Sequence, residues 1–195
     1  MSYSATHPPS VTLQAGPLGR DAKPALAPET APGPGRCAFQ GQPVLEICRG
    51  LPGSGKTTYA RKAVAQHDPE GGLVRVNRDD YRRMLFDPAY QGGNPARERA
   101  VTAAAYGAIR WLLNSGTSVI CDDTNLRDDY LRELTGVAIS CGAEIRMRDE
   151  FLSIPIETCI ARQAKRPPEE RVPAKVIRRM WLRFTGQPTD SAALR

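Results

Sequence analysis

The chain has 195 residues, of which 41% are hydrophobic and 25% charged, values that are typical of a soluble globular protein with one domain. Its 27 Lys and Arg residues against 21 Asp and Glu residues give a formal charge of +6, which favours an anionic partner such as a nucleotide or a nucleic acid. No apolar run is long enough to span a membrane, and the first thirty residues lack the pattern of a secretory signal.

The first 43 residues differ in composition from the remainder of the chain. They contain eight of the 17 prolines, many alanines and glycines, and few large apolar side chains. Such a segment buries too little apolar surface to offset the entropy lost when it is ordered. We therefore expect a disordered N-terminal tail at residues 1–43 and a single folded domain at residues 44–195.

From residue 44 onward, short apolar runs alternate with segments of helical periodicity. Strands are predicted at 44–49, 73–76, 117–121 and 144–152. Helices are predicted at 56–66, from 78 onward, at 95–114, 128–141, 155–166 and 173–184, with Asn77 as an N-cap and Pro173 opening the last helix. This alternation indicates an α/β fold in which helices flank a parallel sheet.

The strongest motif lies between the first predicted strand and the first predicted helix. The segment Gly50-Leu51-Pro52-Gly53-Ser54-Gly55-Lys56-Thr57 fits the phosphate-loop pattern GxxxxGK[ST], and Thr58 follows it. Its glycines let backbone N–H groups face phosphate oxygens at the positive end of a helix. Lys56 is expected to reach the β- and γ-phosphates, and the Thr57 hydroxyl is expected to ligate Mg²⁺. The motif predicts binding of a nucleoside triphosphate, with ATP and Mg²⁺ as cofactors.

A second group of candidate residues follows the second predicted strand. Asp79 and Arg82 are three residues apart, so they share one face of the first helical turn. A carboxylate at the carboxyl end of a parallel strand can accept a proton from an attacking hydroxyl, while the arginine holds an anionic part of the acceptor. The alternative is that Asp79 only complements the helix dipole and Arg82 only faces solvent.

The third strand runs into Cys121-Asp122-Asp123-Thr124-Asn125, which has the form of a Walker B segment. Either Asp122 or Asp123 is a candidate magnesium ligand. The alternative is that these residues only form a turn at the strand exit.

Basic residues gather near the C-terminal end of the chain. Arg162 and Arg166 are four residues apart, before the proline-bounded loop 167–173, and the segment from 146 to 183 holds most of the net positive charge. These features are typical of a short lid that brings an arginine to a transferring phosphoryl group. The alternative is that the cations only complement the helix C-terminus.

Histidine and cysteine usage excludes several other chemistries. The chain has two histidines and five cysteines, and no two cysteines have CxxC spacing. Metal centres rich in histidine or cysteine are therefore poorly supported. Cys48 and Cys121 lie in apolar runs, which is typical of reduced thiols in a cytoplasmic protein.

The segments GLPGSGKT, VNRDDYR, DDTNL and ARQAKRPPEERVPAKVIRRMW together resemble the kinase domain of bacteriophage polynucleotide kinases, from about residue 44 to 184. The resemblance implies a phosphate-loop kinase fold with a short lid. It implies Asp79 as the general base and Arg82 as the ligand of the acceptor phosphate. It also implies Asp123, Thr124 and Asn125 in acceptor binding, and Arg166 as a catalytic lid arginine that contacts ATP with Arg162.

The resemblance further implies transfer of the ATP γ-phosphate to the 5′-hydroxyl of single-stranded DNA or RNA, in nucleic-acid end repair within a bacterial or phage-infected cell. The chain departs in two ways from the phage enzymes that carry a phosphatase domain. It lacks the DxDGT motif of their phosphatase domain, and the Pro-rich tail has no counterpart in their kinase domain.

Two other functions are compatible with these motifs. One is a phosphate-loop kinase of zeta-toxin type that acts on a nucleotide sugar or another hydroxyl metabolite. The other is a nucleotide-binding module without catalysis, which the intact Lys56, Thr57 and Asp79 disfavour.

Overall fold

The protein is described by a computed structural model, which covers residues 41–67, 72–87, 90 and 92–185. The predicted tail lies outside this part of the chain as far as residue 40. Residues 42 and 43 already contact the folded body, because the Gln42 side chain donates to the Gly142 carbonyl at 2.7 Å and the Pro43 carbonyl accepts from the Glu144 amide at 2.8 Å.

The described chain contains a four-stranded parallel sheet with the strand order β2-β3-β1-β4. The strands are β1 (Val44–Cys48), β2 (Leu73–Val76), β3 (Ser118–Cys121) and β4 (Glu144–Arg148). The parallel sheet predicted from the alternating pattern is thereby confirmed. The order places β3 between β2 and β1, so that the carboxyl ends of these three strands are neighbours.

The fourth strand is shorter than the predicted range of 144–152. It ends at Arg148, and the chain continues as a short 3₁₀ helix at Glu150–Ser153. Phe151 packs against Tyr59 of helix α1, with ring centroids 5.6 Å apart, and so does not extend the ladder with β1. The apolar residues of this segment pack against a helix. Periodicity alone does not distinguish such a segment from a buried strand.

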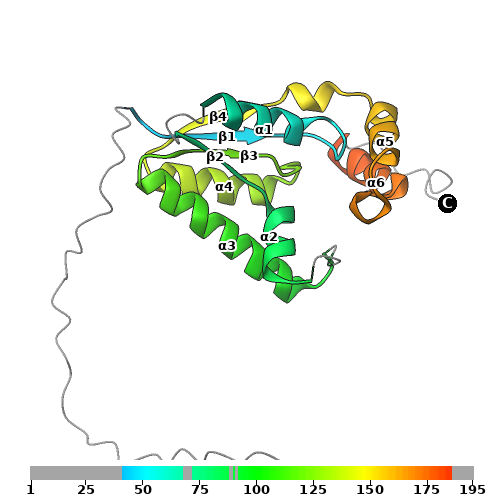
Figure 1. Cartoon of the computed structure of the whole chain (residues 1–195), viewed down its shortest axis with the longest axis horizontal. Coiled ribbons are helices and arrows are strands. Elements are labelled where there is room, and N and C mark those ends of the chain that lie inside the picture. The colour runs from blue at the N-terminus through cyan, green and yellow to red at the C-terminus, as the bar shows by residue number, and fades with distance from the viewer. Residues whose placement is uncertain (1–40, 68–71, 88–89, 91, 186–195) are drawn as a thin grey trace, which may run out of the picture. The chain divides into compact units, whose positions relative to one another are not determined.

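Helices cover both faces of the sheet (Figure 1). They are α1 (Lys56–His67), α2 (Arg78–Leu85), α3 (Pro95–Asn114), α4 (Asp128–Ser140), α5 (Ile156–Ala164) and α6 (Ala174–Thr185), with a second 3₁₀ turn at Pro168–Glu170. Helix α1 lies over one face, and α3 and α4 lie over the other. The α5–α6 pair lies beyond the carboxyl ends of the strands, at the place of the predicted lid.

The alternation of side chains along the strands divides the core into two layers. Leu45 and Ile47 of β1 pack with α3 and α4, whereas Cys48 packs with Ala60 of α1. All of these side chains are fully buried. The α5–α6 pair has a separate cluster around Leu51, Cys159 and Ile177, which fastens it to the phosphate loop. Within the described residues no helix is both long and apolar enough to cross a membrane.

Candidate nucleotide and acceptor site

The predicted motifs meet at the carboxyl edge of the sheet. The phosphate loop follows β1, the Asp122–Asn125 segment follows β3, and α2 follows β2. The segments are joined directly, because the Gly50 amide donates to the Thr124 carbonyl at 3.0 Å and the Arg78 amide donates to Asp123 Oδ1 at 3.0 Å. The edge that binds ligands in open parallel sheets therefore carries all three motifs.

The phosphate loop has the backbone that its glycines permit. Gly53 and Gly55 have φ angles of +88° and +107°, in the left-handed region that other residues rarely adopt. A Cβ atom on Gly53 would lie 2.4 Å from the Cys159 carbonyl oxygen, so helix α5 rests directly on the loop. The loop leads into the N-terminus of α1, where backbone N–H groups and the helix dipole favour an anion.

Lys56 is held inside the loop. Its ammonium donates to the carbonyls of Gly50 and Leu51, both at 2.8 Å, and to Ser54 Oγ at 3.2 Å. Burial lowers the pKa of Lys56 to about 8, and the negative charge of Asp122 opposes this shift. The ammonium is therefore within electrostatic reach of the carboxylate at the end of β3. A bound phosphate would supply the countercharge that the buried ammonium lacks.

The two predicted lid arginines differ in placement. Arg162 Nη1 donates to the carbonyls of Gly53 at 3.3 Å and Ser54 at 3.4 Å, so its guanidinium lies on the phosphate loop. The Arg166 side chain is exposed, and the backbone carbonyl of Arg166 accepts a hydrogen bond from Arg171 Nε. Arg162 therefore contacts the phosphate loop in this structure, whereas the resemblance placed the catalytic role on Arg166.

The two aspartates after β3 have different partners. Asp122 Oδ1 accepts from Asn77 Nδ2 at 3.0 Å and pairs with Arg75 Nε at 2.9 Å. Asp122 Oδ2 is buried and has no hydrogen-bond partner among the described residues. A buried carboxylate oxygen without a partner beside a phosphate loop fits a magnesium ligand.

Asp123 is fully engaged by Arg78. Its two oxygens accept from the Arg78 amide and from Arg78 Nε, each at 3.0 Å. Burial raises the pKa of Asp123, and the Arg78 guanidinium opposes this shift. Of the two candidate magnesium ligands, the geometry thus favours Asp122.

Thr57 is the protein ligand that would complete this magnesium site, at the first turn of α1. The described residues contain no group of three or more His, Cys, Asp or Glu side chains that could hold a metal ion. Mg²⁺ at Asp122 and Thr57 would therefore share its remaining ligands between nucleotide phosphates and water, which is its usual mode of binding.

Arg78 has a structural role that the sequence did not reveal. Its guanidinium lies 4.6 Å from the Tyr130 ring centroid, and the Arg127 guanidinium also stacks on Tyr130, at 4.3 Å. With Asp123 it joins the start of α2, the end of β3 and the start of α4. No local pattern separates this buried arginine from the other charged residues of its segment.

Asp79 and Arg82 lie together, as their spacing predicts. Arg82 Nη1 donates to Asp79, and the opposite edge of the guanidinium is held by Glu98 of α3, with Nε at 2.9 Å from Oε1 and Nη2 at 2.6 Å from Oε2. The Tyr90 hydroxyl donates to Glu98 at 3.2 Å. Glu98 was not predicted, because its position in the first turn of a helix is also that of an ordinary dipole-complementing acid.

Asn125 and Thr124 hold the loop after β3 in place. Asn125 has a φ angle of +47°, and its buried amide donates to the carbonyls of Cys48 at 2.9 Å and Cys121 at 3.4 Å. This amide ties β1 to β3, a role that differs from the acceptor contact implied for Asn125. Thr124 also lines a pocket that residues of α6 line as well.

The sheet order, the phosphate loop and the strand-end aspartates define a phosphate-loop protein with the kinase fold. Residues 45–187 match the AAA domain family, and the chain belongs to that family.

Two solved structures are similar to this chain. A chain in "Structure of the Pnkp1/Rnl/Hen1 RNA repair complex" is 28% identical with a TM-score of 0.62, and the match covers 76% of this chain and 46% of that chain. A chain in "Structure of Pnkp1/Rnl/Hen1 complex" is 32% identical with a TM-score of 0.52, and the match covers 62% of this chain and 38% of that one. This chain thus spans less than half the length of either.

Proposed function

We propose that this protein is a phosphotransferase that moves the γ-phosphate of ATP to the 5′-hydroxyl of single-stranded DNA or RNA. The observation that carries the proposal is the pairing of Asp79 with Arg82 near the strand-end Asp123, at the same carboxyl edge of the sheet as the phosphate loop. A carboxylate next to a cation suits an acceptor that carries both a hydroxyl and a nearby phosphate. The similarity to a chain of an RNA repair complex supports the same substrate class.

Each part of the site has a place in this reaction. Lys56 and Arg162 supply positive charge at the phosphate loop. Arg166 would join them if the lid turns it toward the transferring group. Mg²⁺ at Asp122 and Thr57 would neutralise charge on the phosphates of ATP. Asp79 would accept the proton of the attacking hydroxyl.

The contacts of Arg82 link acceptor binding to the base. Glu98 holds Nε and Nη2 of Arg82, while Nη1 is directed at Asp79. An acceptor phosphate that takes over the Nη1 donor would leave Asp79 free to accept the hydroxyl proton. A nucleoside with a 3′-phosphate would then be a better acceptor than the same nucleoside without one.

A direct test compares a nucleoside 3′-monophosphate with the bare nucleoside as acceptors. A charge-assisted contact contributes about 1.5–3 kcal/mol, so we expect kcat/KM to favour the monophosphate by roughly 10- to 150-fold. Arg82→Ala should remove this preference. Arg83→Ala is the matched control, because Arg83 pairs with Asp80 at the surface and should leave the preference intact. Equal use of both acceptors by the wild type would refute the role of Arg82, and transfer only to nucleotide sugars would support the zeta-toxin-type alternative.

A further inference from the structure

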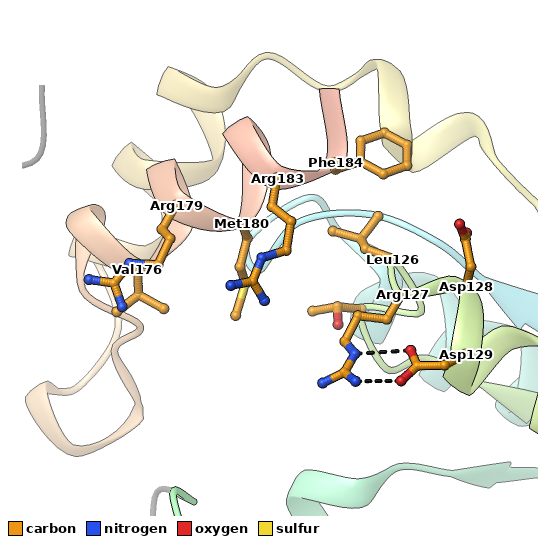
Figure 2. A pocket seen from close by; sticks show the side chains of 10 residues that line it. Leu126, Arg127, Asp128, Asp129, Val176, Arg179, Met180, Arg183 and Phe184 are labelled. Carbon is orange, nitrogen blue, oxygen red and sulfur yellow. Dashed lines mark hydrogen bonds and ion pairs between the residues drawn. The ribbon is translucent and has the colours of Figure 1, made fainter. Parts of the chain in front are cut away.

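A pocket of about 560 Å³ lies between the start of α4 and helix α6, next to the loop that follows β3. One wall is formed by Thr124, Leu126 and the first turn of α4, and the other wall is formed by one face of α6 (Figure 2). Thr124 directly follows Asp123 and is bonded through its carbonyl to Gly50. The pocket therefore lies directly beside the carboxyl edge of the sheet, which carries the proposed catalytic residues.

The two walls of the pocket differ in charge. On the α4 side, Arg127 is paired with Asp129 through Nε and Nη2, so its charge is balanced there. On the α6 side, neither Arg179 nor Arg183 is paired with a carboxylate among the residues that the structure describes, and both are exposed. In Figure 2 the Arg183 side chain extends from α6 toward the space beside Arg127, and the Arg179 side chain extends from α6 next to Val176. Within the described part of the chain, the α6 wall thus presents two cations that no carboxylate neutralises.

The spacing of these cations suits a linear polyanion. Arg179 and Arg183 are four residues apart on one helix, which places their Cα atoms about 6 Å apart along the helix axis. Both lie on the same face of α6. Two adjacent phosphates of one strand can therefore be held by consecutive turns of this helix.

Apolar side chains lie between and beside the cations. Met180 and Phe184 of α6 line the pocket opposite Leu126, and Phe184 remains 38% exposed. Basic residues that alternate with an exposed aromatic ring are the combination that binds single-stranded nucleic acid, since phosphates meet the cations and bases stack on the ring. An apolar peptide would leave the two guanidinium groups without partners.

We infer that this pocket binds the acceptor strand on the 3′ side of its terminal nucleoside, as a subsite for single-stranded nucleic acid. Arg179 and Arg183 hold backbone phosphates there, and Phe184 stacks with a base. The inference rests on the proposed function, because it assigns the reacting 5′ end to Asp79 and Arg82 and only the following nucleotides to α6.

The test is a series of acceptors of increasing length, from a nucleoside 3′-monophosphate to an octanucleotide, as both DNA and RNA. Wild type should gain affinity with length, and this gain should weaken as salt is raised. In Arg179→Gln/Arg183→Gln, the slope of log affinity against log salt for the octanucleotide should fall by about 1.4, because each contact with a single strand contributes about 0.7. The monophosphate should be used as well as by wild type. Phe184→Leu should lower octanucleotide affinity about fivefold or more with little change in the salt slope.

Arg110→Gln is the control for the loss of a positive charge elsewhere on the surface. Arg110 lies near the end of α3, hydrogen-bonded to Ser140 at the C-terminus of α4, and its loss should not change the length dependence.

Binding of a labelled 5′-hydroxyl octanucleotide, measured by fluorescence anisotropy, separates this inference from the proposed function. An unchanged salt slope in the double variant, or no binding by wild type, would overturn the subsite. Phosphorylation of the monophosphate with no gain from length would overturn the subsite alone, whereas octanucleotide binding through α6 without phosphorylation would overturn the proposed function alone.

Discussion

Asp79 and Asp80 are adjacent carboxylates with different surroundings. Asp79 contacts Arg82 and is largely exposed, whereas Asp80 is paired with both Arg75 and Arg83. The two arginines lower the pKa of Asp80, although burial opposes them. Asp79 is therefore the group available to a substrate, and Asp80 is engaged in holding α2 to β2.

Asp79→Asn should lower kcat by about 10²- to 10⁴-fold, because it removes the proton acceptor, while ATP affinity changes little. Asp80→Asn is the control, and it should retain most activity with a stability change within about 1 kcal/mol, since its ion pairs are partly exposed. Steady-state kinetics and thermal unfolding of both variants provide the measurements. If Asp80→Asn were the inactive variant, the base would be Asp80.

Substitutions of Asp122 and Asp123 should have different effects. Loss of the Asp122 carboxylate should weaken magnesium binding, whereas loss of the Asp123 carboxylate should destabilise the fold. Asp122→Asn should raise the Mg²⁺ concentration for half-maximal activity by at least about tenfold, since even groups that only orient metal ligands contribute tenfold or more. Asp123→Asn should lower the free energy of unfolding by about 3–5 kcal/mol, because it leaves the buried Arg78 guanidinium without its carboxylate. Magnesium titrations and urea denaturation distinguish them. Reversed phenotypes would show that Asp123 is the metal ligand.

Lys56 gives the nucleotide site a pH dependence of defined sign. Its pKa is about 8 in the folded, nucleotide-free protein, compared with an ordinary value of 10.5. Below pH 8 Lys56 is protonated in both the folded and the unfolded protein, so burial of its charge lowers the free energy of unfolding by the full amount. This loss of stability decreases as the pH rises from 8 to 10.5. Binding of ATP should instead weaken as the pH rises, because only the protonated ammonium attracts phosphate.

We accordingly expect kcat/KM for ATP to fall as the pH rises through about 8, since this parameter reports ionisation in the free enzyme. Lys56→Arg should have lower activity throughout, but that activity should not fall over this pH range, because arginine stays protonated. A wild-type profile that is flat to pH 9.5 would contradict this assignment of the titrating group.

At the scale of elements, the packing of α5 on the phosphate loop couples the lid to the nucleotide site. The contact depends on Gly53, since a Cβ atom there would lie 2.4 Å from the Cys159 carbonyl oxygen. Arg162 reaches the same part of the loop from one turn further along α5. A shift of α5 therefore displaces the arginine that contacts the loop.

Gly53→Ala should lower stability by about 1–3 kcal/mol and weaken ATP binding, because it adds both a clash and a strained φ angle. Gly107→Ala is the matched control. Gly107 lies inside α3 with nothing within 4 Å of an added Cβ atom, so this change should stabilise the protein by about 0.5–1 kcal/mol. Thermal unfolding and ATP titration give the two readouts, and unaltered ATP affinity in Gly53→Ala would show that α5 does not support the loop.

Local patterns predicted most elements at this scale. Strands next to Gly-rich turns and a helix with an N-cap at Asn77 are encoded within a few residues, and the structure confirms that the Asn77 side chain accepts hydrogen bonds from the helix that it opens. Asn94 has the same role at the start of α3, which was not predicted. The end of β4 was not predictable in this way. Whether Phe151 pairs as a strand or packs against Tyr59 depends on a helix that is distant in the sequence.

For the whole molecule, the sequence predicted which segments form the site but not how their side chains are paired. The phosphate loop and the Asp79–Arg82 pair follow from spacing within single segments. The partners Arg78–Asp123 and Arg82–Glu98 join residues from different elements, so they depend on the packed fold. The same packing distinguishes Asp122 from Asp123, either of which the sequence allowed as the magnesium ligand, and it places Arg162 on the phosphate loop, whereas the resemblance gave the catalytic role to Arg166.

The central claim, transfer of phosphate to a polynucleotide end, is tested most directly with γ-labelled ATP, Mg²⁺ and one oligonucleotide in two forms. The account predicts that label enters the 5′-hydroxyl form and not the 5′-phosphorylated form, and that Lys56→Ala lowers this transfer by at least about 10²-fold, because a preorganised charge at the phosphates is lost. Free nucleosides and UDP-N-acetylglucosamine should accept little label under the same conditions. Transfer to the nucleotide sugar but not to the 5′-hydroxyl oligonucleotide would contradict it.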